Sequence, residues 1–166
     1  AAALSGPSHA LSGHVKGTQM KLQDLVAKVG ETLGTSEWMT VDQSRIDAFA
    51  DVTEDHQFIH VNPEMAKATP LGSTVAHGFL TLSLLSKMLE SAVEKPQVAM
   101  SINYGFDKVR FLSFVKSGSK VRGHFKLLEM EEKRPGQWQQ KVEATVEIEG
   151  ETKPALIAEW IFQHFG

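Results

Sequence analysis

The sequence of 166 residues contains no cysteine, which excludes disulfides, thiolate nucleophiles and zinc sites built on cysteine. It has no excess of basic residues either, because 17 Lys and Arg stand against 20 Asp and Glu, for a net charge of −3. A nucleic-acid-binding protein usually has a basic face, so we expect no nucleic-acid partner. No apolar run reaches the roughly 18 residues that a membrane-spanning helix needs. We therefore expect a cytoplasmic protein without a membrane span.

The chain has the length of one domain, since typical domains run to about 100–200 residues. Its hydrophobic share of 42% and charged share of 22% are ordinary for a globular protein. Residues 1–19 lack a periodic apolar pattern, whereas Met20 opens an amphipathic stretch. We interpret residues 1–19 as an added leader or a disordered extension, with the remnant of a targeting segment as the alternative. Residues 20–166 are interpreted as the folded domain.

Three short helices are predicted in the first half of the domain. Apolar residues at helical spacing indicate a helix over residues 21–29. Asp42 is placed to cap a second helix that ends near residues 52–53. Asn62 followed by Pro63 is a typical start for the third. The residues between the second and third helices, 53–60, are interpreted as a loop.

The longest predicted helix spans residues 75–93 and is apolar on nearly every side, which indicates a buried helix. Alternating and β-branched segments separated by turn residues predict strands at 36–40, 98–106, 109–114, 119–131, 138–148 and 154–162. One buried helix followed by a run of strands predicts an α+β fold, an antiparallel sheet wrapped around a long central helix. Such a sheet has open edges, and pairing of edges between two copies would close them. We therefore expect a homodimer.

Two proton-handling side chains, Asp55 and His60, lie five positions apart. Gly78 follows after a small-residue segment, at the start of the predicted long helix. If that helix begins near Ala76, the Gly78 N–H has no intrahelical partner and can hold a carbonyl oxygen. If the helix begins at Ser73, the same N–H is used within the helix and this role fails. A close contact between helix and sheet is the alternative reason for a glycine at this position.

Residues 49–60, with Asp55 and His60, together with the Ala-His-Gly-Phe sequence at 76–79, resemble the hydratase signature of MaoC-like hot-dog proteins. This family includes the (R)-specific enoyl-CoA hydratases, and the resemblance covers nearly the whole chain from Met20. It implies a hot-dog fold in which Asp55 and His60 are catalytic and the Gly78 N–H holds a thioester oxygen. Ser86 falls where some members keep a serine near the active site.

The signature departs from the commonest family pattern at Gln57-Phe58, where many members have Asn-Pro. Together with the segment at 103–111, this variant resembles the nodulation-protein-N-like branch. The departure leaves the physiological substrate more open than the reaction. We count Gln57, Phe58, His77 and Phe79 among the candidate substrate-binding residues, with Phe58 and Phe79 as apolar walls of the site.

The reaction follows from the residue types. Water attacks C3 of an enoyl thioester while negative charge builds on the thioester oxygen, which a fixed N–H donor would stabilise. An imidazole titrates near neutral pH, so His60 suits the base role. Asp55 either gives a proton to C2, which requires a buried site with apolar walls, or stays ionised and orients the water. The residues leave both roles open, as they do a structural role for the pair, in which Asp55 caps a turn and His60 is a core histidine.

Other polar residues near the motif are weaker candidates. We expect His56 to be exposed and His77 to fix the loop before the helix. His56, His60 and His77 could in principle bind zinc, but we expect no metal. Ser86 lies on the predicted buried helix, where packing or a hydrogen bond to substrate suits it. Lys108 and Arg110 are the best candidates to contact the phosphates of coenzyme A or of an acyl carrier protein.

The sequence thus predicts an (R)-specific enoyl-CoA hydratase, or 3-hydroxyacyl-CoA dehydratase, of fatty acid metabolism that needs no metal or redox cofactor. A hot-dog thioesterase is one alternative, although the only acid on the long helix is Glu90, at its far end. A non-catalytic module that binds acyl thioesters is the other. Acyl length, the carrier and the pathway stay open.

Overall fold

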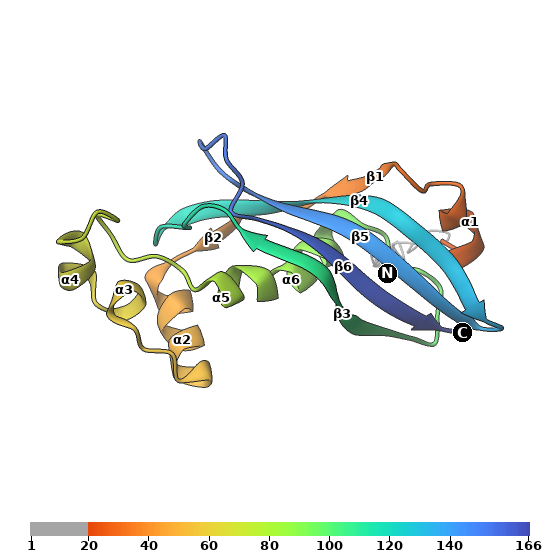
Figure 1. The fold of residues 1–166 in the computed structure, drawn as a ribbon, viewed down its shortest axis with the longest axis horizontal. Helices are drawn as coiled ribbons and strands as arrows, with labels where there is room; N and C mark the ends of the chain where they lie inside the picture. The colour runs from red at the N-terminus through yellow and green to blue at the C-terminus, as the bar shows by residue number, and fades with distance from the viewer. Residues whose placement is uncertain (1–19) are drawn as a thin grey trace, which may run out of the picture.

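The structure is a computed structural model that describes residues 20–166 (Figure 1). The predicted leader, residues 1–19, lies outside the described residues. Within the described part of the chain, no helix is long and apolar enough to cross a membrane.

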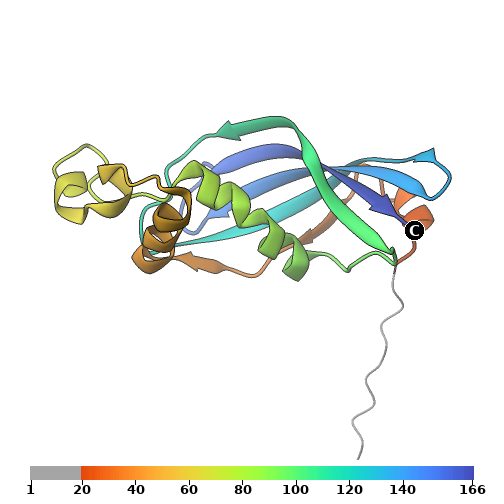
Figure 2. The same cartoon turned by 90° about the horizontal axis from the view of Figure 1, so that it is seen from below.

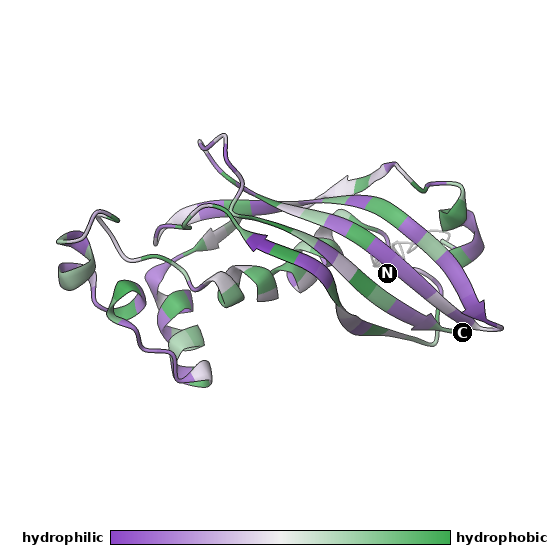
Figure 3. Cartoon of the chain, viewed as in Figure 1, coloured by the Kyte–Doolittle hydropathy of each residue, from purple (hydrophilic) through white to green (hydrophobic). Residues whose placement is uncertain are grey.

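A single antiparallel sheet forms the main layer of the fold. Its strands are β1 (Thr32–Thr35), β2 (Met39–Val41), β3 (Met100–Phe111), β4 (Ser119–Arg134), β5 (Gln137–Ile148) and β6 (Leu156–Phe165). They are ordered β1-β4-β5-β6-β3, and β2 also pairs with β4. Along β5 every second residue is buried. The hydropathy of the residues alternates along this strand in Figure 3. The sheet therefore presents one apolar face. Among residues 20–166, β3 lies at one end of the strand order and no strand pairs with its outer edge.

The central helix lies against the apolar face of the sheet, as Figure 2 shows from below. This arrangement confirms the predicted hot-dog architecture. It consists of α5 (Gly78–Ser83) and α6 (Leu85–Ala92), which together are shorter than the predicted 75–93. Leu85 and Met88 are fully buried under the sheet. The prediction that the helix is buried all round was wrong at Phe79, which is 68% exposed in the single chain.

The helix starts late because the preceding segment is bonded to other parts of the fold. The Val75 N–H donates to the Ile59 carbonyl at 2.9 Å, and the Ala76 N–H donates to the Val115 carbonyl at 2.7 Å. These two hydrogen bonds hold the segment against α3 and the loop before β4, and His77 still has a non-helical backbone with φ −59° and ψ 139°, so the helix starts only at Gly78.

Four short helices precede the central one: α1 (Leu22–Val26), α2 (Gln43–Thr53), α3 (Phe58–Val61) and α4 (Pro63–Lys67). The predicted caps are confirmed, since the Asp42 carboxylate accepts the Arg45 N–H and the Asn62 side chain accepts the Met65 N–H. The predicted loop at 53–60 was wrong in its second half, because α3 takes up residues 58–61. The first helix is shorter than the predicted 21–29.

The predicted pair of strands at 98–106 and 109–114 is one strand, β3. Irregularities in its pairing with β6 at Asn103/Gly105 and Phe106/Lys108 bend it without ending it. The sequence did not predict β1, which has only four residues and none that is buried.

The outer face of the sheet carries an ionic cluster on β4 and β5. The Arg122 Nε donates to the Glu147 carboxylate at 2.7 Å, and the His124 ring Nε2 lies 2.6 Å from the same oxygen. The Arg122 guanidinium, followed by His124, holds the pKa of the Glu147 carboxyl below its usual range.

Candidate active site

The segment that carries Asp55 and His60 begins with a sharp turn at the end of α2. Glu54 closes that helix in the left-handed conformation, with φ 62°. Asp55 follows in the turn, and its side chain accepts the Gln57 N–H at 3.3 Å. The chain then forms α3, which presents His60 to the interior, where it is 7% exposed.

The orientation of the His60 ring is fixed by the backbone. Its Nδ1 lies 2.6 Å from the carbonyl oxygen of Val75, which can only accept a hydrogen bond. Nδ1 therefore carries the proton of the neutral ring, and the Nε2 lone pair is left free. A histidine held in this tautomer can take a proton at Nε2 without moving.

His77 links the two halves of the site. Its ring stacks on that of His60, with ring centroids 3.9 Å apart and planes inclined by 24°. Its Nε2 lies 3.0 Å from the Asp55 carbonyl oxygen and donates to it. Phe49 packs at the other side, with centroids 4.9 Å apart. The predicted role of fixing the loop agrees with these contacts. The His77 Nδ1 is buried and has no hydrogen-bond partner among the described residues.

Asp55 and His60 face one another, as the predicted chemistry requires. One carboxylate oxygen of Asp55 and one ring nitrogen each of His60 and His77 lie within 4.8 Å of one another. Two hydrogen bonds of roughly 2.8 Å can span such a gap, so one water molecule can contact both Asp55 and His60. The walls expected around this water are open in the single chain, because Phe58 is 37% and Phe79 is 68% exposed.

The same three residues are close enough to raise the question of a metal ion. An imidazole binds a metal through a lone pair that lies in the ring plane. The stacked planes of His60 and His77, inclined by only 24°, do not converge near their nitrogens. Both rings cannot therefore bind one ion in this geometry, and their donor set fits a water molecule better.

Gly78 is the first residue of α5, so its N–H lies in the first turn and has no intrahelical partner. The condition for the oxygen-binding role is thus met, with His77 at the cap position. The alternative reason for the glycine also holds, since a Cβ at this position would lie 3.0 Å from the Phe111 ring. A side chain at this position would therefore crowd both the approach to the N–H group and the Phe111 ring.

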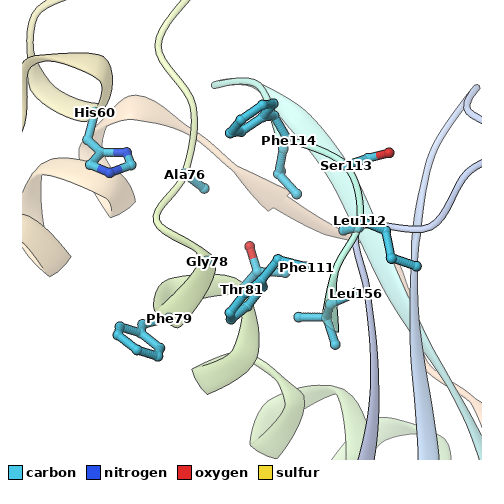
Figure 4. Close-up of a pocket in the computed structure, with 12 residues that line it drawn as sticks. His60, Ala76, Gly78, Phe79, Thr81, Phe111, Leu112, Ser113, Phe114 and Leu156 are labelled. Atoms are coloured by element: carbon cyan, nitrogen blue, oxygen red, sulfur yellow. The ribbon is translucent and has the colours of Figure 1, made fainter. Parts of the chain in front are cut away.

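A cavity of about 350 Å³ opens beside this N–H (Figure 4). His60, Gly78 and Phe79 are the sequence-predicted residues that line it. The rest of the wall comes from the central helix and its approach, from the end of β3 and the loop after it, and from the start of β6: Ala76, Thr81, Phe111, Leu112, Ser113, Phe114, Val115, Ala155 and Leu156. None of these was predicted as a site residue, because their place in the wall follows from tertiary packing.

The other predicted site residues lie outside this cavity. Gln57 and Phe58 are exposed beside Asp55 but are not part of the wall. Ser86 was expected on a buried helix, but it is exposed on α6 and lines a different cavity. A hydrogen bond from Ser86 to substrate stays a prediction. Lys108 and Arg110 are exposed on β3, and strand alternation directs them to the opposite face from Phe111. Neither is among the residues that line this cavity in the single chain.

His56 is exposed, as expected, and lies 2.9 Å from the carboxylate of Asp51. Its hydrogen bond to that carboxylate raises the pKa of His56. The pair lies on the surface next to the turn, and His56 is not among the residues that line the cavity.

An antiparallel sheet wraps around a central helix, His60 and the first-turn N–H of Gly78 line one cavity, and Asp55 lies within 4.8 Å of His60 although it does not line that cavity. This arrangement defines a hot-dog protein with a site for acyl chemistry. Residues 24–152 match the family described as MaoC like domain, and the chain belongs to this family.

Two relatives show how close the match is. Nodulation protein N from Rhizobium leguminosarum bv. viciae is 53% identical over 145 residues, covering 86% of this chain and 90% of the relative. The 3-hydroxyacyl-thioester dehydratase Z of Mycobacterium tuberculosis is 46% identical over 141 residues, covering 85% and 93%. Among solved structures, the R-hydratase PhaJ1 from Pseudomonas aeruginosa has the same fold, with a TM-score of 0.70, 21% identity, and coverage of 87% of this chain and 84% of that chain.

Proposed function

We propose that this protein is an (R)-specific enoyl-thioester hydratase, which reversibly adds water to a trans-2-enoyl thioester to give an (R)-3-hydroxyacyl thioester. The observation that carries the proposal is the approach of the Asp55 carboxylate and the His60 ring nitrogen to within 4.8 Å. Membership of the MaoC-like family supports the reaction class, as does the close relative named as a 3-hydroxyacyl-thioester dehydratase.

In the proposed mechanism the Gly78 N–H binds the thioester oxygen and stabilises the charge that develops on it. The attacking water lies between Asp55 and His60. His60 takes a proton from the water at Nε2, and the Val75 carbonyl, which accepts from Nδ1, stabilises the resulting imidazolium. The hydroxyl bonds to C3, and the imidazolium of His60 gives the proton taken from the water to C2, so the reaction consumes one water and returns His60 to its neutral form. Asp55, which is exposed in the single chain, orients the water in this mechanism. Neither a metal ion nor a redox cofactor takes part.

The proposed assembly is a homodimer formed through the β3 edges. Met100, Ile102 and Tyr104 are large apolar residues of β3 with exposed fractions of 52%, 37% and 59%. A twelve-residue strand with a free edge and such side chains is a template for pairing. In a twofold dimer the two strands pair antiparallel. Light scattering of the native protein at micromolar concentration should give twice the mass of the chain, and a monomer would contradict the assembly.

The activity is tested with crotonyl-CoA, by following absorbance of the enoyl-thioester band together with free thiol. We expect the band to disappear without release of thiol. Thiol release would instead indicate a thioesterase, and no change in either signal from a folded protein would indicate a binding module. The thioesterase has little support, because Glu90, the acid on the central helix, lines the other cavity.

The carrier, coenzyme A or an acyl carrier protein, is the remaining partner in this proposal. Parallel assays with crotonyl-CoA and with the same acyl group on a carrier protein distinguish the two. Contacts of Lys108 and Arg110 with carrier phosphates stay a prediction, as does the cytoplasmic location.

A further inference from the structure

A second cavity, of about 470 Å³, lies at the other end of the central helix and shares no lining residue with the first. Its volume is within the range of small-molecule sites, roughly 300–1,000 Å³. Apolar side chains from α1, β1, α6 and β6 form much of its wall: Leu25, Leu33, Leu89, Val93 and Phe162. The wall therefore suits an apolar chain.

A chain of hydrogen bonds interrupts this apolar wall. The Ser101 hydroxyl lies 2.7 Å from the His164 Nδ1, and the His164 Nε2 lies 2.8 Å from the Gln140 amide oxygen. All three side chains line the cavity, and His164 and Gln140 are only 3% and 8% exposed. With the amide oxygen facing it, Nε2 donates to Gln140, and Nδ1 accepts from Ser101. We call these three residues the polar relay.

The polar relay is uncharged but keeps hydrogen-bonding capacity for a ligand. Burial lowers the pKa of His164, which favours the neutral ring. The Ser101 oxygen can still accept a hydrogen bond, and no hydrogen bond in the described part of the chain uses the Gln140 amide N–H groups. Glu90, Glu94 and Lys95 also line the cavity, and the excess of acid over base disfavours an anionic ligand. A hydroxyl or carbonyl on an otherwise apolar chain matches these groups.

Pairing of two β3 strands over their full length would bring the two kinds of cavity together. Phe111, the last residue of β3, lines the first cavity, and Met100, the first residue of β3, lines the second. Antiparallel pairing of two β3 strands with full overlap places residue 111 of one copy opposite residue 100 of the other. The first cavity of each copy then adjoins the second cavity of its partner copy.

We propose that the second cavity holds the acyl tail of a substrate whose thioester is bound in the first cavity of the other copy, and that the polar relay selects tails carrying an uncharged oxygen group. This inference rests on the proposed hydratase function and dimer. It names the substrate class as medium-chain enoyl thioesters with a hydroxyl or keto group near the end of the chain.

The first test compares kcat/KM for trans-2-octenoyl-, decenoyl- and dodecenoyl-CoA with that for the same chains bearing a terminal hydroxyl. A net hydrogen bond should favour the hydroxylated form of the best-fitting chain by about two- to tenfold. The triple variant Ser101→Ala, Gln140→Leu, His164→Leu replaces the relay by apolar groups and leaves no partner unpaired. It should abolish or reverse the preference, and a urea unfolding curve checks that the triple variant is folded.

The control is Ser91→Ala, which removes a hydroxyl that bonds to the Met88 carbonyl on the same helix and lines neither cavity. It should keep the native preference. Equal rates for plain and hydroxylated chains in the native protein, or a preference that the triple variant retains, would overturn the inference while crotonyl-CoA hydration upheld the function. A native protein that is folded but inactive on crotonyl-CoA would refute the proposed function itself.

Mixed dimers test the contribution of the second copy. An Asp55→Asn copy with the native relay is combined with a copy that has native Asp55 and the apolar triple replacement. If the tail crosses the dimer, the active first cavity adjoins a native relay, and the preference for the hydroxylated chain returns. A preference as low as that of the triple variant alone would show that the tail stays within one copy.

Discussion

From the stacking of His77 on His60 we predict that His77 is a positioning residue. It affects the rate only by holding Asp55 and His60 in place. His77 does not line the cavity beside Gly78, yet it contacts both sides of the water site. Three variants separate its contacts. His77→Phe keeps a ring on His60 but loses the hydrogen bond to the Asp55 carbonyl. His77→Gln keeps a donor near that carbonyl but loses the stack, and His77→Ala loses both.

The magnitudes follow from these contacts. Leaving the Asp55 carbonyl unpaired costs about 1–3 kcal/mol, and losing the stacked ring costs about 0.5–1.5 kcal/mol beyond its buried area. A displacement of about 1 Å at a reacting group can lower a rate by about 10²-fold. We therefore expect kcat to fall about tenfold in His77→Phe and His77→Gln and about a hundredfold in His77→Ala. KM should stay near its native value in all three.

The assay is steady-state hydration of crotonyl-CoA with a urea unfolding curve for each variant. A loss of kcat at constant KM, in variants folded at the assay temperature, supports a positioning role. Native kcat in both His77→Phe and His77→Ala would refute the reasoning. A rise in KM with native kcat would instead place the ring in contact with substrate.

Three further outcomes are expected. Asp55→Asn and His60→Ala should each lower kcat by about 10²–10⁴ without loss of the fold, measured by crotonyl-CoA hydration and circular dichroism; rates within tenfold of native would remove both from the mechanism. Gly78→Ala should lower activity because its Cβ would lie 3.0 Å from the Phe111 ring, and adding Phe111→Ala should restore part of the rate; no recovery would point to the altered backbone N–H instead. The carboxyl of Glu147 has a lowered pKa in the fold, so its stabilising effect is present above the ordinary glutamate pKa and is lost as pH falls through the folded value. Glu147→Gln should therefore lower stability by less than about 1 kcal/mol at pH 7 and have no effect near pH 2, as read from urea midpoints; an equal loss at both pH values would contradict this.

Local chemistry allowed several features to be predicted from the sequence. The caps at Asp42 and Asn62 are confirmed because a side chain bonds to an N–H three residues later, whatever the rest of the chain does. The proximity of Asp55 and His60 was likewise predicted from a local motif, because the two residues are only five positions apart. The resemblance to a known family supplied the hot-dog fold, which the strand and helix patterns alone indicated only in outline.

Features set by distant partners could not be predicted. The start of the central helix at Gly78 depends on carbonyls of Ile59 and Val115, which no window around residue 75 contains. The polar relay depends on strand register, since Ser101 lies opposite His164 in the pairing of β3 with β6. The aromatic wall at Phe111 arises in the same way, from where a bent edge strand ends above the helix.

The hydrogen bond from His60 to the Val75 carbonyl joins the proposed base to the same short stretch of chain that ends in the proposed amide donor, Gly78. A shift of either group would displace the other, so the distance between them is set by this one segment. The acyl cavity can therefore be reshaped by substitutions at Phe111, at the end of β3, whereas residues 75–78 should be kept unchanged or moved together into another protein.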